Sequence, residues 1–261
     1  MKVVLFCGGR GLRLSEYPEP IPKPMVPVGY RPILWHVMRY YAHYGHNDFV
    51  LCLGYRADAI KNYFLKYSEA LSNDFVLSEG GRKVELLASD IDHWRITFAN
   101  SGLQANLGMR LMSVRHHLDG EEYFLANYGD TLTDAPLDDL IDKFKRSGKV
   151  AAFLSVKPTY SFHVVRHKSD GDGVVSEIED VTDSDLWING GYFIFRKELF
   201  DYIEPGDELV VEPFKRLIKE EKLIAYQHRG FWAPMDTLKD RESLERMHDT
   251  GMPPWAVWQR S

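Results

Sequence analysis

A glycine-rich segment near the amino terminus has the composition of a phosphate-binding loop. Gly8, Gly9 and Gly11 follow directly after an apolar run, and Arg13 comes two residues later. Glycines let backbone N–H groups approach phosphate oxygens closely. The segment lacks the last glycine of the dinucleotide fingerprint and the Gly-Lys-Ser/Thr ending of a P-loop. A glycine-rich turn between core elements is therefore the alternative reading of this segment.

A lysine between two prolines adds a second cation to this region. Lys23 stands between Pro22 and Pro24, ten residues after Arg13. Because prolines fix φ, they limit the positions that the ammonium group can reach. A cation held in this way suits a triphosphate, so we predict that Arg13 and Lys23 bind phosphates. A solvated surface lysine is the alternative.

Two aspartates are candidate ligands for Mg²⁺. Asp130 follows a predicted buried strand through Tyr128 and Gly129, which places it where open α/β folds bind ligands. Asp236 stands between an apolar segment and a predicted helix, so it is either a ligand or the N-cap of that helix. If both converge, they offer the hard oxygens that Mg²⁺ prefers. Together with Lys23, the metal would stabilise charge at the α-phosphate during in-line displacement.

The spacing of apolar residues predicts an α/β fold. A strand at 3–7, a helix at 33–44, a strand at 49–53 and a helix at 57–67 indicate a doubly wound, mostly parallel sheet. Further strands are predicted at 123–126, 150–156, 164–167, 174–179 and 191–195, and further helices at 107–117, 137–146, 211–221 and 238–249. Segments 83–88 and 95–100 are interpreted as an antiparallel excursion. We expect one domain, with a nucleotide-binding half at about 1–160 and a β-rich acceptor-binding half at about 161–261 that packs on the same sheet.

Composition narrows the class of protein. With 261 residues and 44% hydrophobic content, the chain can bury one sizeable core. A net charge of −6 with scattered Lys and Arg argues against nucleic acid and anionic membranes as partners. The cysteines, Cys7 and Cys52, lie in apolar runs and are expected to be reduced core residues. We found no signal peptide and no apolar stretch of roughly 18 residues, so we expect a cytoplasmic protein without a membrane span.

Several motifs, in this order, resemble those of the bacterial glucose-1-phosphate cytidylyltransferases, a family of sugar-1-phosphate nucleotidyltransferases. They are the glycine segment through Leu14, Lys23-Pro24-Met25, Pro32 to His36, Tyr128-Gly129-Asp130, Ile188 to Phe193, Gly230 to Thr237, and the terminal Pro254-Trp255 with Trp258. The resemblance covers nearly the whole chain. The number of these motifs, their order and their spacing are together more specific evidence for the family than any single motif.

The resemblance implies roles for individual residues. Those implied to bind the nucleotide and Mg²⁺ are Gly8, Gly9, Gly11, Arg13, Lys23, Asp130 and Asp236. Those implied to meet the sugar are Glu179, Asn189 and Gly190. Arg110, with Ser101, Gly102 and Gly108, is similar to the segment that recognises cytosine, and its guanidinium could read the acceptor edge of that base. A solvated or ion-paired arginine is the alternative. Because members of the family are commonly oligomeric, we expect a homo-oligomer.

Two positions depart from the family pattern. Leu12 replaces a threonine whose hydroxyl could bind a phosphate or ribose. Glu179-Asp180-Val181 stands where the family has Glu-Lys-Pro, so a carboxylate replaces the lysine that would bind the sugar's phosphate. This reversal predicts another acceptor, such as a modified sugar or cyclitol phosphate, or reduced activity. His163, Arg166 or Lys168 are candidate substitute cations.

These observations predict a Mg²⁺-dependent transfer of a nucleoside monophosphate, CMP from CTP, to glucose 1-phosphate or a related sugar or cyclitol phosphate. The attacking oxygen belongs to the acceptor, so no protein nucleophile is required. A catalytically weak, regulatory nucleotide-binding protein of the same fold is the alternative. A dehydrogenase is set aside, because the second strand ends without the acidic residue that would bind a ribose.

Overall fold

Seven strands form the central sheet, in the order β14-β10-β13-β8-β1-β4-β7. The computed structural model describes all residues except 10–20, 160–161, 170, 172 and 261. The strands are β1 (Val3–Phe6), β4 (Asp48–Leu53), β7 (Arg95–Asn100), β8 (Tyr123–Asn127), β10 (Ala151–Val156), β13 (Ile188–Arg196) and β14 (Leu223–His228). β13 runs antiparallel to β8 and β10, whereas the other neighbours pair in parallel. The predicted mostly parallel α/β fold is therefore confirmed.

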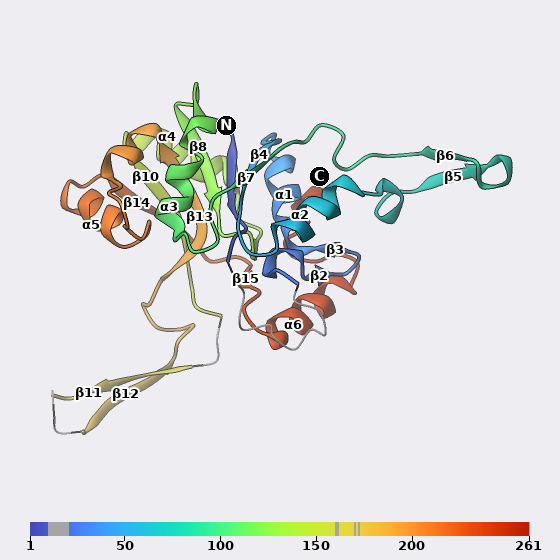
Figure 1. Ribbon diagram of the computed structural model, residues 1–261. Helices are drawn as coiled ribbons and strands as arrows, with labels where there is room; N and C mark the ends of the chain where they lie inside the picture. Colours follow the sequence, from blue (N-terminus) through green and yellow to red (C-terminus); the bar gives the residue numbers. More distant parts are fainter. Residues whose placement is uncertain (10–20, 160–161, 170, 172, 261) are drawn as a thin grey trace.

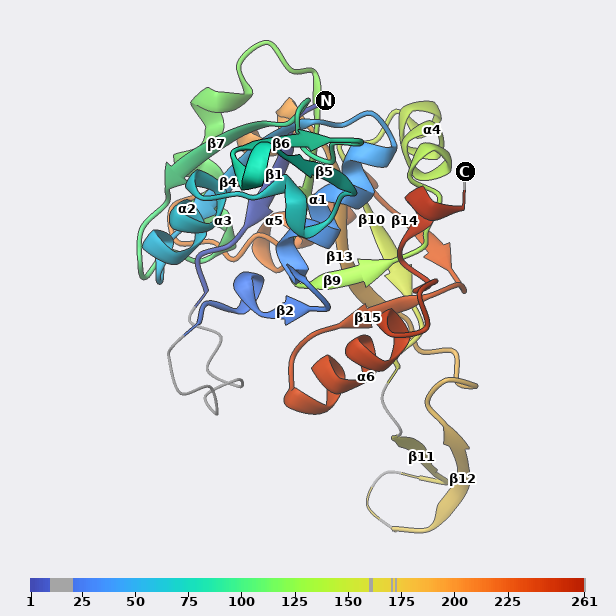
Figure 2. The same cartoon turned by 90° about the vertical axis from the view of Figure 1, so that its right-hand side faces the viewer.

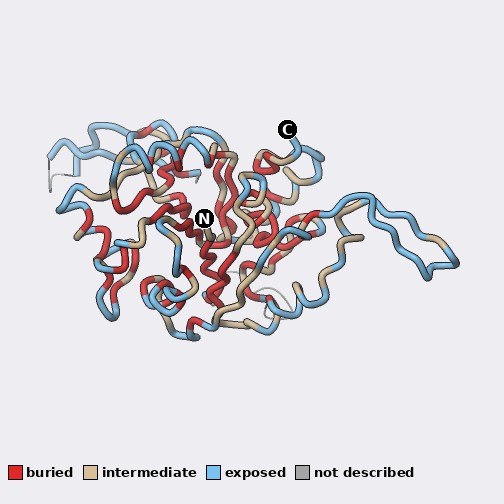
Figure 3. Tube along the Cα trace, turned by 90° about the horizontal axis from the view of Figure 1, so that it is seen from above, coloured by how far each residue is buried: buried red, intermediate tan, exposed pale blue. Residues whose placement is uncertain are grey.

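Helices pack on both faces of this sheet (Figures 1 and 2). They are α1 (Ile33–His43), α2 (Ala57–Leu65), α3 (Leu107–Ser113), α4 (Leu137–Ser147), α5 (Glu212–Lys219) and α6 (Leu238–His248). Val3 and Leu5 of β1 pack in one core with α1 and α4, whereas Val4 and Phe6 pack in a second core with α3 and α5. The central strands are therefore buried on both sides, as Figure 3 shows. This explains their continuous apolar sequences. None of the helices in the described part of the chain has the length and apolar character needed to cross a bilayer.

Smaller elements lie outside the central sheet. Four two-stranded pairs are β2 (Pro27–Val28) with β3 (Arg31–Pro32), β5 (Phe75–Ser78) with β6 (Lys83–Leu86), β9 (Thr131–Thr133) with β15 (Trp232–Pro234), and β11 (His163–His167) with β12 (Val175–Asp180). Short 3₁₀ helices are η2 (Lys23–Met25), η3 (Glu69–Leu71), η4 (Glu79–Gly81), η5 (Arg115–Leu118), η6 (Lys197–Tyr202) and η7 (Val257–Gln259). The hairpins β5–β6 and β11–β12 project from the body in different directions (Figure 1).

Three segments differ from the prediction. The residues at 95–100 do not leave the sheet: β7 is its edge strand and pairs in parallel with β4. The excursion is the hairpin β5–β6, whose first strand the sequence did not reveal because its apolar residues are exposed and show no buried face. The helix expected at 107–117 ends at Ser113 and continues as η5. In the second half, β13 and β14 join the central sheet while β11–β12 leaves it.

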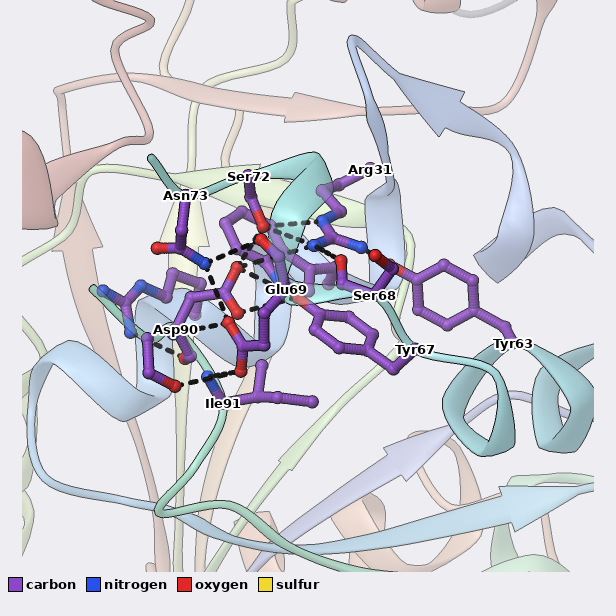
Figure 4. A network of polar contacts seen from close by, with 12 residues as sticks. Arg31, Tyr63, Tyr67, Ser68, Glu69, Ser72, Asn73, Asp90 and Ile91 are labelled. Atoms are coloured by element: carbon purple, nitrogen blue, oxygen red, sulfur yellow. Dashed lines mark hydrogen bonds and ion pairs between the residues drawn. The ribbon is translucent and has the colours of Figure 1, made fainter. Parts of the chain in front are cut away.

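A buried polar network fixes the base of the β5–β6 excursion (Figure 4). Arg31 is 1% exposed and its Nη2 donates to the Ser68 carbonyl at 2.8 Å. The same guanidinium lies 4.1 Å from the centre of the Tyr67 ring and 3.8 Å from the Asp90 carboxylate. The Tyr67 hydroxyl donates to Asp90 at 2.9 Å. The network therefore ties the beginning and the end of the excursion to β3 and, through it, to α1.

Candidate active site

The carboxyl ends of the parallel strands meet at one edge of the central sheet. Gly8 and Gly9 follow β1 at this edge, Asp130 follows β8, and Asn189 lies at the start of the antiparallel β13. Open α/β sheets bind ligands in the crevice outside this edge. Gly8 and Gly9 on one side, and Asn189 and Gly190 on the other, therefore lie along the same edge as Asp130.

Lys23, Asp130 and Asp236 lie together in one cluster of charged side chains, the candidate reaction centre. The Nζ atom of Lys23 lies 2.5 Å from Oδ2 of Asp130 and 2.5 Å from Oδ1 of Asp236. The three side chains are 16%, 18% and 30% exposed, so solvent screens them only in part. Three segments that are distant in the sequence converge here on one point.

Local backbone contacts hold Lys23 and Asp130 in place. Lys23 begins η2, a turn that the N–H of Val26 closes by donating to the Lys23 carbonyl at 3.1 Å. Asp130 follows Gly129, which has a φ of +80°, a region that favours glycine. The N–H of Gly129 donates to the side-chain oxygen of Asn127 at 2.6 Å. The chain therefore turns sharply after β8 and aims the Asp130 carboxylate along the sheet edge.

Asp236 is brought to Asp130 by a long-range strand pair. β15 pairs with β9, and the N–H of Met235 donates to the Asp130 carbonyl at 3.0 Å. The N-cap of α6 is Thr237, whose hydroxyl accepts from the N–H of Asp240 in a capping box. The N-cap reading of Asp236 is therefore wrong: its side chain turns to Lys23 instead.

The charges of the reaction centre depend on one another. Burial disfavours the ammonium of Lys23, but Asp130 and Asp236 outweigh burial and raise the pKa of Lys23 above its ordinary value. Burial also raises the pKa of Asp130, while the ion pair with Lys23 opposes that shift. Lys23 therefore stays protonated at neutral pH and supplies a fixed positive charge between two carboxyl groups.

The donor set of Asp130 and Asp236 fits Mg²⁺. Their carboxylates face one point, and in phosphoryl-transfer sites Mg²⁺ takes one or two carboxylates and completes its shell with water and phosphate oxygens. Among the described residues, no three or more His, Cys, Asp and Glu side chains gather as metal ligands. The two carboxylates are therefore the described residues that could hold Mg²⁺ here.

Arg110 is buried directly behind the glycine segment. Its guanidinium donates to the carbonyls of Gly8 at 3.1 Å and Gly102 at 3.0 Å, and to the hydroxyl of Ser101 at 2.8 Å. It is 4% exposed, and burial lowers its pKa. This arrangement differs from the predicted contact with a base and from the solvated alternative, because most of its donors bind the protein's own oxygens. Arg110 therefore positions the backbone at Gly8.

Asn189 and Gly190 are oriented by hydrogen bonds at the start of β13. The Asn189 amide donates to the Tyr128 hydroxyl at 2.9 Å and accepts from the N–H of Gly191 at 2.9 Å. The Gly190 carbonyl accepts from the indole of Trp232 at 2.8 Å. The sequence placed Tyr128 and Trp232 in the family motifs but predicted neither of these two hydrogen bonds. Their position beside Asp130 and Asp236 was the available signal, but sequence does not show which way a ring points.

The predicted substitute cations lie on or beside the hairpin β11–β12. Arg166 pairs with Glu179 at 2.9 Å, so these two side chains neutralise each other on the hairpin. His163 and Lys168 are exposed. Asp180 accepts from the backbone of the turn that follows it. The hairpin projects away from the body (Figure 1), and none of these cations is placed at the reaction centre.

The glycine segment from position 10 onward falls outside the described residues. Gly11, Leu12 and Arg13 are among the positions concerned. Their predicted contacts with the nucleotide remain predictions. The described part of the site consists of the glycines after β1, the Lys23 centre, Arg110 and the residues at the start of β13.

Comparisons with known proteins agree with this geometry. The nucleotidyl transferase family matches residues 2–240. The chain is 36% identical over 260 residues to a protein of Bacillus subtilis named as a probable glucose-1-phosphate cytidylyltransferase, covering 99% of this chain and 100% of that protein. It is 34% identical to the glucose-1-phosphate cytidylyltransferase of Salmonella typhimurium, again over 99% and 100% of the two chains.

Solved structures share the fold. A UTP-bound UGPase from Acinetobacter baumannii superposes with a TM-score of 0.69 at 18% identity, covering 99% of this chain and 96% of the other. A UDP-glucose pyrophosphorylase solved with UDP-glucose also gives a TM-score of 0.69, at 16% identity, over 96% and 99% of the chains. Together with the full-length relatives, these matches show that the chain belongs to the nucleotidyl transferase family, among the glucose-1-phosphate cytidylyltransferases.

Proposed function

We propose that the protein transfers CMP from CTP to a sugar 1-phosphate, in a reaction that requires Mg²⁺ and releases pyrophosphate. The observation that carries this proposal is the convergence of Lys23, Asp130 and Asp236 at the sheet edge beside Gly8. The full-length similarity to cytidylyltransferases supports the choice of CTP and of an acceptor related to glucose 1-phosphate.

The transfer is an in-line displacement at phosphorus. A phosphate oxygen of the acceptor attacks the α-phosphorus of CTP, the bond from this phosphorus to the bridging oxygen breaks, and pyrophosphate leaves with the bonding electrons. Asp130 and Asp236 would hold Mg²⁺, which would neutralise charge on the reacting phosphates. Lys23 offers ammonium donors to the phosphoryl oxygens on which charge develops.

The neighbouring residues bind and orient the two substrates. Arg110 fixes the Gly8 carbonyl, so the backbone at this residue does not have to order when the nucleotide binds. Asn189 and Gly190 lie on the other side of Asp130, where the acceptor has to approach. Because the reacting oxygen belongs to the acceptor, the chain contributes positioning and charge stabilisation.

The regulatory alternative receives no support, since the full-length relatives are named as transferases. The predicted homo-oligomer is part of the proposal. Apolar side chains on β5–β6, among them Leu77 and Val84, are more than half exposed, and exposed apolar surface of this kind is typical of protein interfaces. Light scattering during size-exclusion chromatography measures the oligomeric state.

Pyrophosphate release tests the proposed reaction. We would supply CTP, UTP, dTTP, ATP and GTP in turn, each with glucose 1-phosphate and with other sugar and cyclitol phosphates, with Mg²⁺ or with EDTA. We expect acceptor-dependent release with CTP that EDTA abolishes. Asp130→Asn should lose at least about 100-fold in turnover, whereas Asp142→Asn on the exposed face of α4 should not. Pyrophosphate release with another nucleotide instead of CTP would overturn the assignment of CTP. Nucleotide binding without pyrophosphate release from any pair of nucleotide and acceptor would overturn the proposed reaction.

A further inference from the structure

Two cations flank one tryptophan at the end of the sheet edge. Lys157 follows β10, and its Nζ lies 4.9 Å from the ring centre of Trp187. Arg229 follows β14, and its Cζ lies 5.1 Å from the same ring. Strand register accounts for this arrangement: Val156 pairs with both Ile188 and His228, so the next residue on β10, the next on β14 and the residue before β13 are neighbours.

Neither cation forms an ion pair with a carboxylate within the described part of the chain; Asp134 instead accepts from His228 and from the N–H of Phe231, on either side of Arg229. No carboxylate lies within 4.0 Å of Lys157 or of Arg229 there. The Lys157 ammonium donates to the carbonyl of Ser184, which satisfies one of its three donors and none of its charge. Two like charges that share one ring repel each other, and an anion between them would relieve that repulsion.

The cluster lies on the acceptor side of the reaction centre. In the strand order β14-β10-β13-β8, Asp130 follows β8, and Asn189 lies at the start of the intervening β13. Adjacent strands are ~4.8 Å apart, so the end of β10 is about 10 Å from the end of β8. A phosphate held at Lys23 therefore leaves the opposite end of the acceptor near Lys157 and Arg229.

A cavity is lined by residues that closely follow the two cations in the sequence. It has a volume of about 550 Å³ and lies between β15 and α6. Thr159 and Gly230, which closely follow the two cations, line it, and so does Trp232, whose indole holds the Gly190 carbonyl. There is thus space beside the cluster for a group attached to a sugar or cyclitol ring.

We propose that Lys157, Arg229 and Trp187 bind a second anionic group of the acceptor. The acceptor class is then a sugar or cyclitol phosphate that carries a carboxylate or a second phosphate remote from the reacting phosphate. This inference rests on the proposed function and leaves its chemical step unchanged. It also accounts for two neighbouring cations that form no ion pair with the described residues.

Acceptor preference tests the proposal. We would measure kcat/KM with CTP for glucose 1-phosphate, glucuronic acid 1-phosphate and glucose 1,6-bisphosphate. We expect at least one acceptor with two anionic groups to exceed glucose 1-phosphate by about tenfold or more, and the carboxylate and bisphosphate arms identify the anion. The preference is the ratio of kcat/KM for the doubly anionic acceptor to kcat/KM for glucose 1-phosphate. In Lys157→Met and in Arg229→Met this ratio should fall about tenfold, because KM for the doubly anionic acceptor rises.

A matched control separates a local charge effect from general loss of a lysine. Lys143 also lies over an aromatic ring, 5.4 Å from the centre of Tyr226, and also donates to a carbonyl, but it is on α4. Lys143→Met should keep the preference. The inference would be overturned if glucose 1-phosphate were turned over at least as well as every doubly anionic acceptor. It would also be overturned if the variants lost kcat/KM equally for all acceptors. Either result would leave the proposed function standing. Absence of turnover with every acceptor would overturn both.

Discussion

Removal of the Lys23 charge should strengthen the binding of a divalent cation to the nucleotide-free protein. The Lys23 ammonium contacts the same carboxylate oxygens that Mg²⁺ would use, at 2.5 Å from Asp130 and 2.5 Å from Asp236. A metal ion that binds there has to displace this ammonium or tolerate its repulsion. Lys23→Met keeps an unbranched side chain of similar length and removes the charge.

The size of the effect follows from the geometry. Two unit charges 4 Å apart interact by about 4 kcal/mol at an effective dielectric constant of 20. The three side chains are 16% to 30% exposed, and salt screens them further, so we reduce this value to about 1–2 kcal/mol. That difference corresponds to about 5- to 30-fold tighter binding.

Calorimetric or paramagnetic titration with Mn²⁺, without nucleotide, measures the change. Lys23→Met should bind Mn²⁺ more tightly than the wild type, while its turnover should fall by about 100-fold because the phosphates lose their cation. The double variant Lys23→Met/Asp236→Asn should lose the gain in Mn²⁺ affinity. The control variant Lys143→Met should bind Mn²⁺ as the wild type does. Equal Mn²⁺ affinity in folded wild type and Lys23→Met would refute the idea that ammonium and metal share these carboxylates.

Three further predictions concern the glycine segment and the core. A Cβ on Gly8 would meet the Arg110 guanidinium at 1.9 Å, whereas one on Gly9 would meet nothing within 4 Å. Gly8→Ala should therefore weaken nucleotide binding about tenfold by calorimetry, which is about 1.4 kcal/mol of binding free energy, and Gly9→Ala should not. Equal effects would contradict the steric argument. Arg110→Met leaves buried carbonyls without donors and should lower the free energy of unfolding by about 3 kcal/mol in urea, and a loss under 1 kcal/mol would contradict its positioning role. Burial lowers the pKa of His36 to about 4, so the unfolded chain binds a proton at this residue more tightly than the folded chain does. The free energy of unfolding should therefore decrease as the pH falls from about 6.5 to 4. The decrease from this residue is at most about 3 kcal/mol. In His36→Gln, the slope of unfolding free energy against pH in this window should be smaller, and an unchanged slope would assign it to other groups.

Uninterrupted apolar runs in the sequence predicted the strands at the centre of the sheet, whereas β5 and β14 were missed. β1 and β4 are buried along their length, and uninterrupted apolar runs mark them clearly. β5 has apolar residues that face solvent, and β14 is only half-buried, so neither has a pattern that separates it from a loop. The parallel pairing of β7 with β4 is a tertiary property that spacing in one segment does not contain.

The reaction centre was predictable as a list of residues but not as an arrangement. Residue type and adjacency to predicted strands single out Lys23 and Asp130. Whether Asp236 caps a helix or faces Lys23 depends on the pairing of β15 with β9, which joins segments about 100 residues apart. The burial of Arg110 was not predictable for a related reason. A basic residue on a helix is usually solvated, and its burial depends on carbonyl groups from three other segments.

The nucleotide side and the proposed acceptor side of the sheet edge differ in how amino-acid substitutions affect them. At the nucleotide side, the Gly8 carbonyl and the Arg110 guanidinium fix each other, so a side chain added at Gly8 forces a buried charge to move. At the acceptor side, Lys157 and Arg229 follow the ends of strands, and their replacement changes charge without changing the backbone. A new acceptor can therefore be accommodated by substitutions at strand ends, while a new nucleotide geometry requires the buried arginine and its carbonyl partners to change together. On this argument, Lys157→Met alters the choice of acceptor and leaves the fold intact, whereas Arg110→Met lowers stability and nucleotide affinity together.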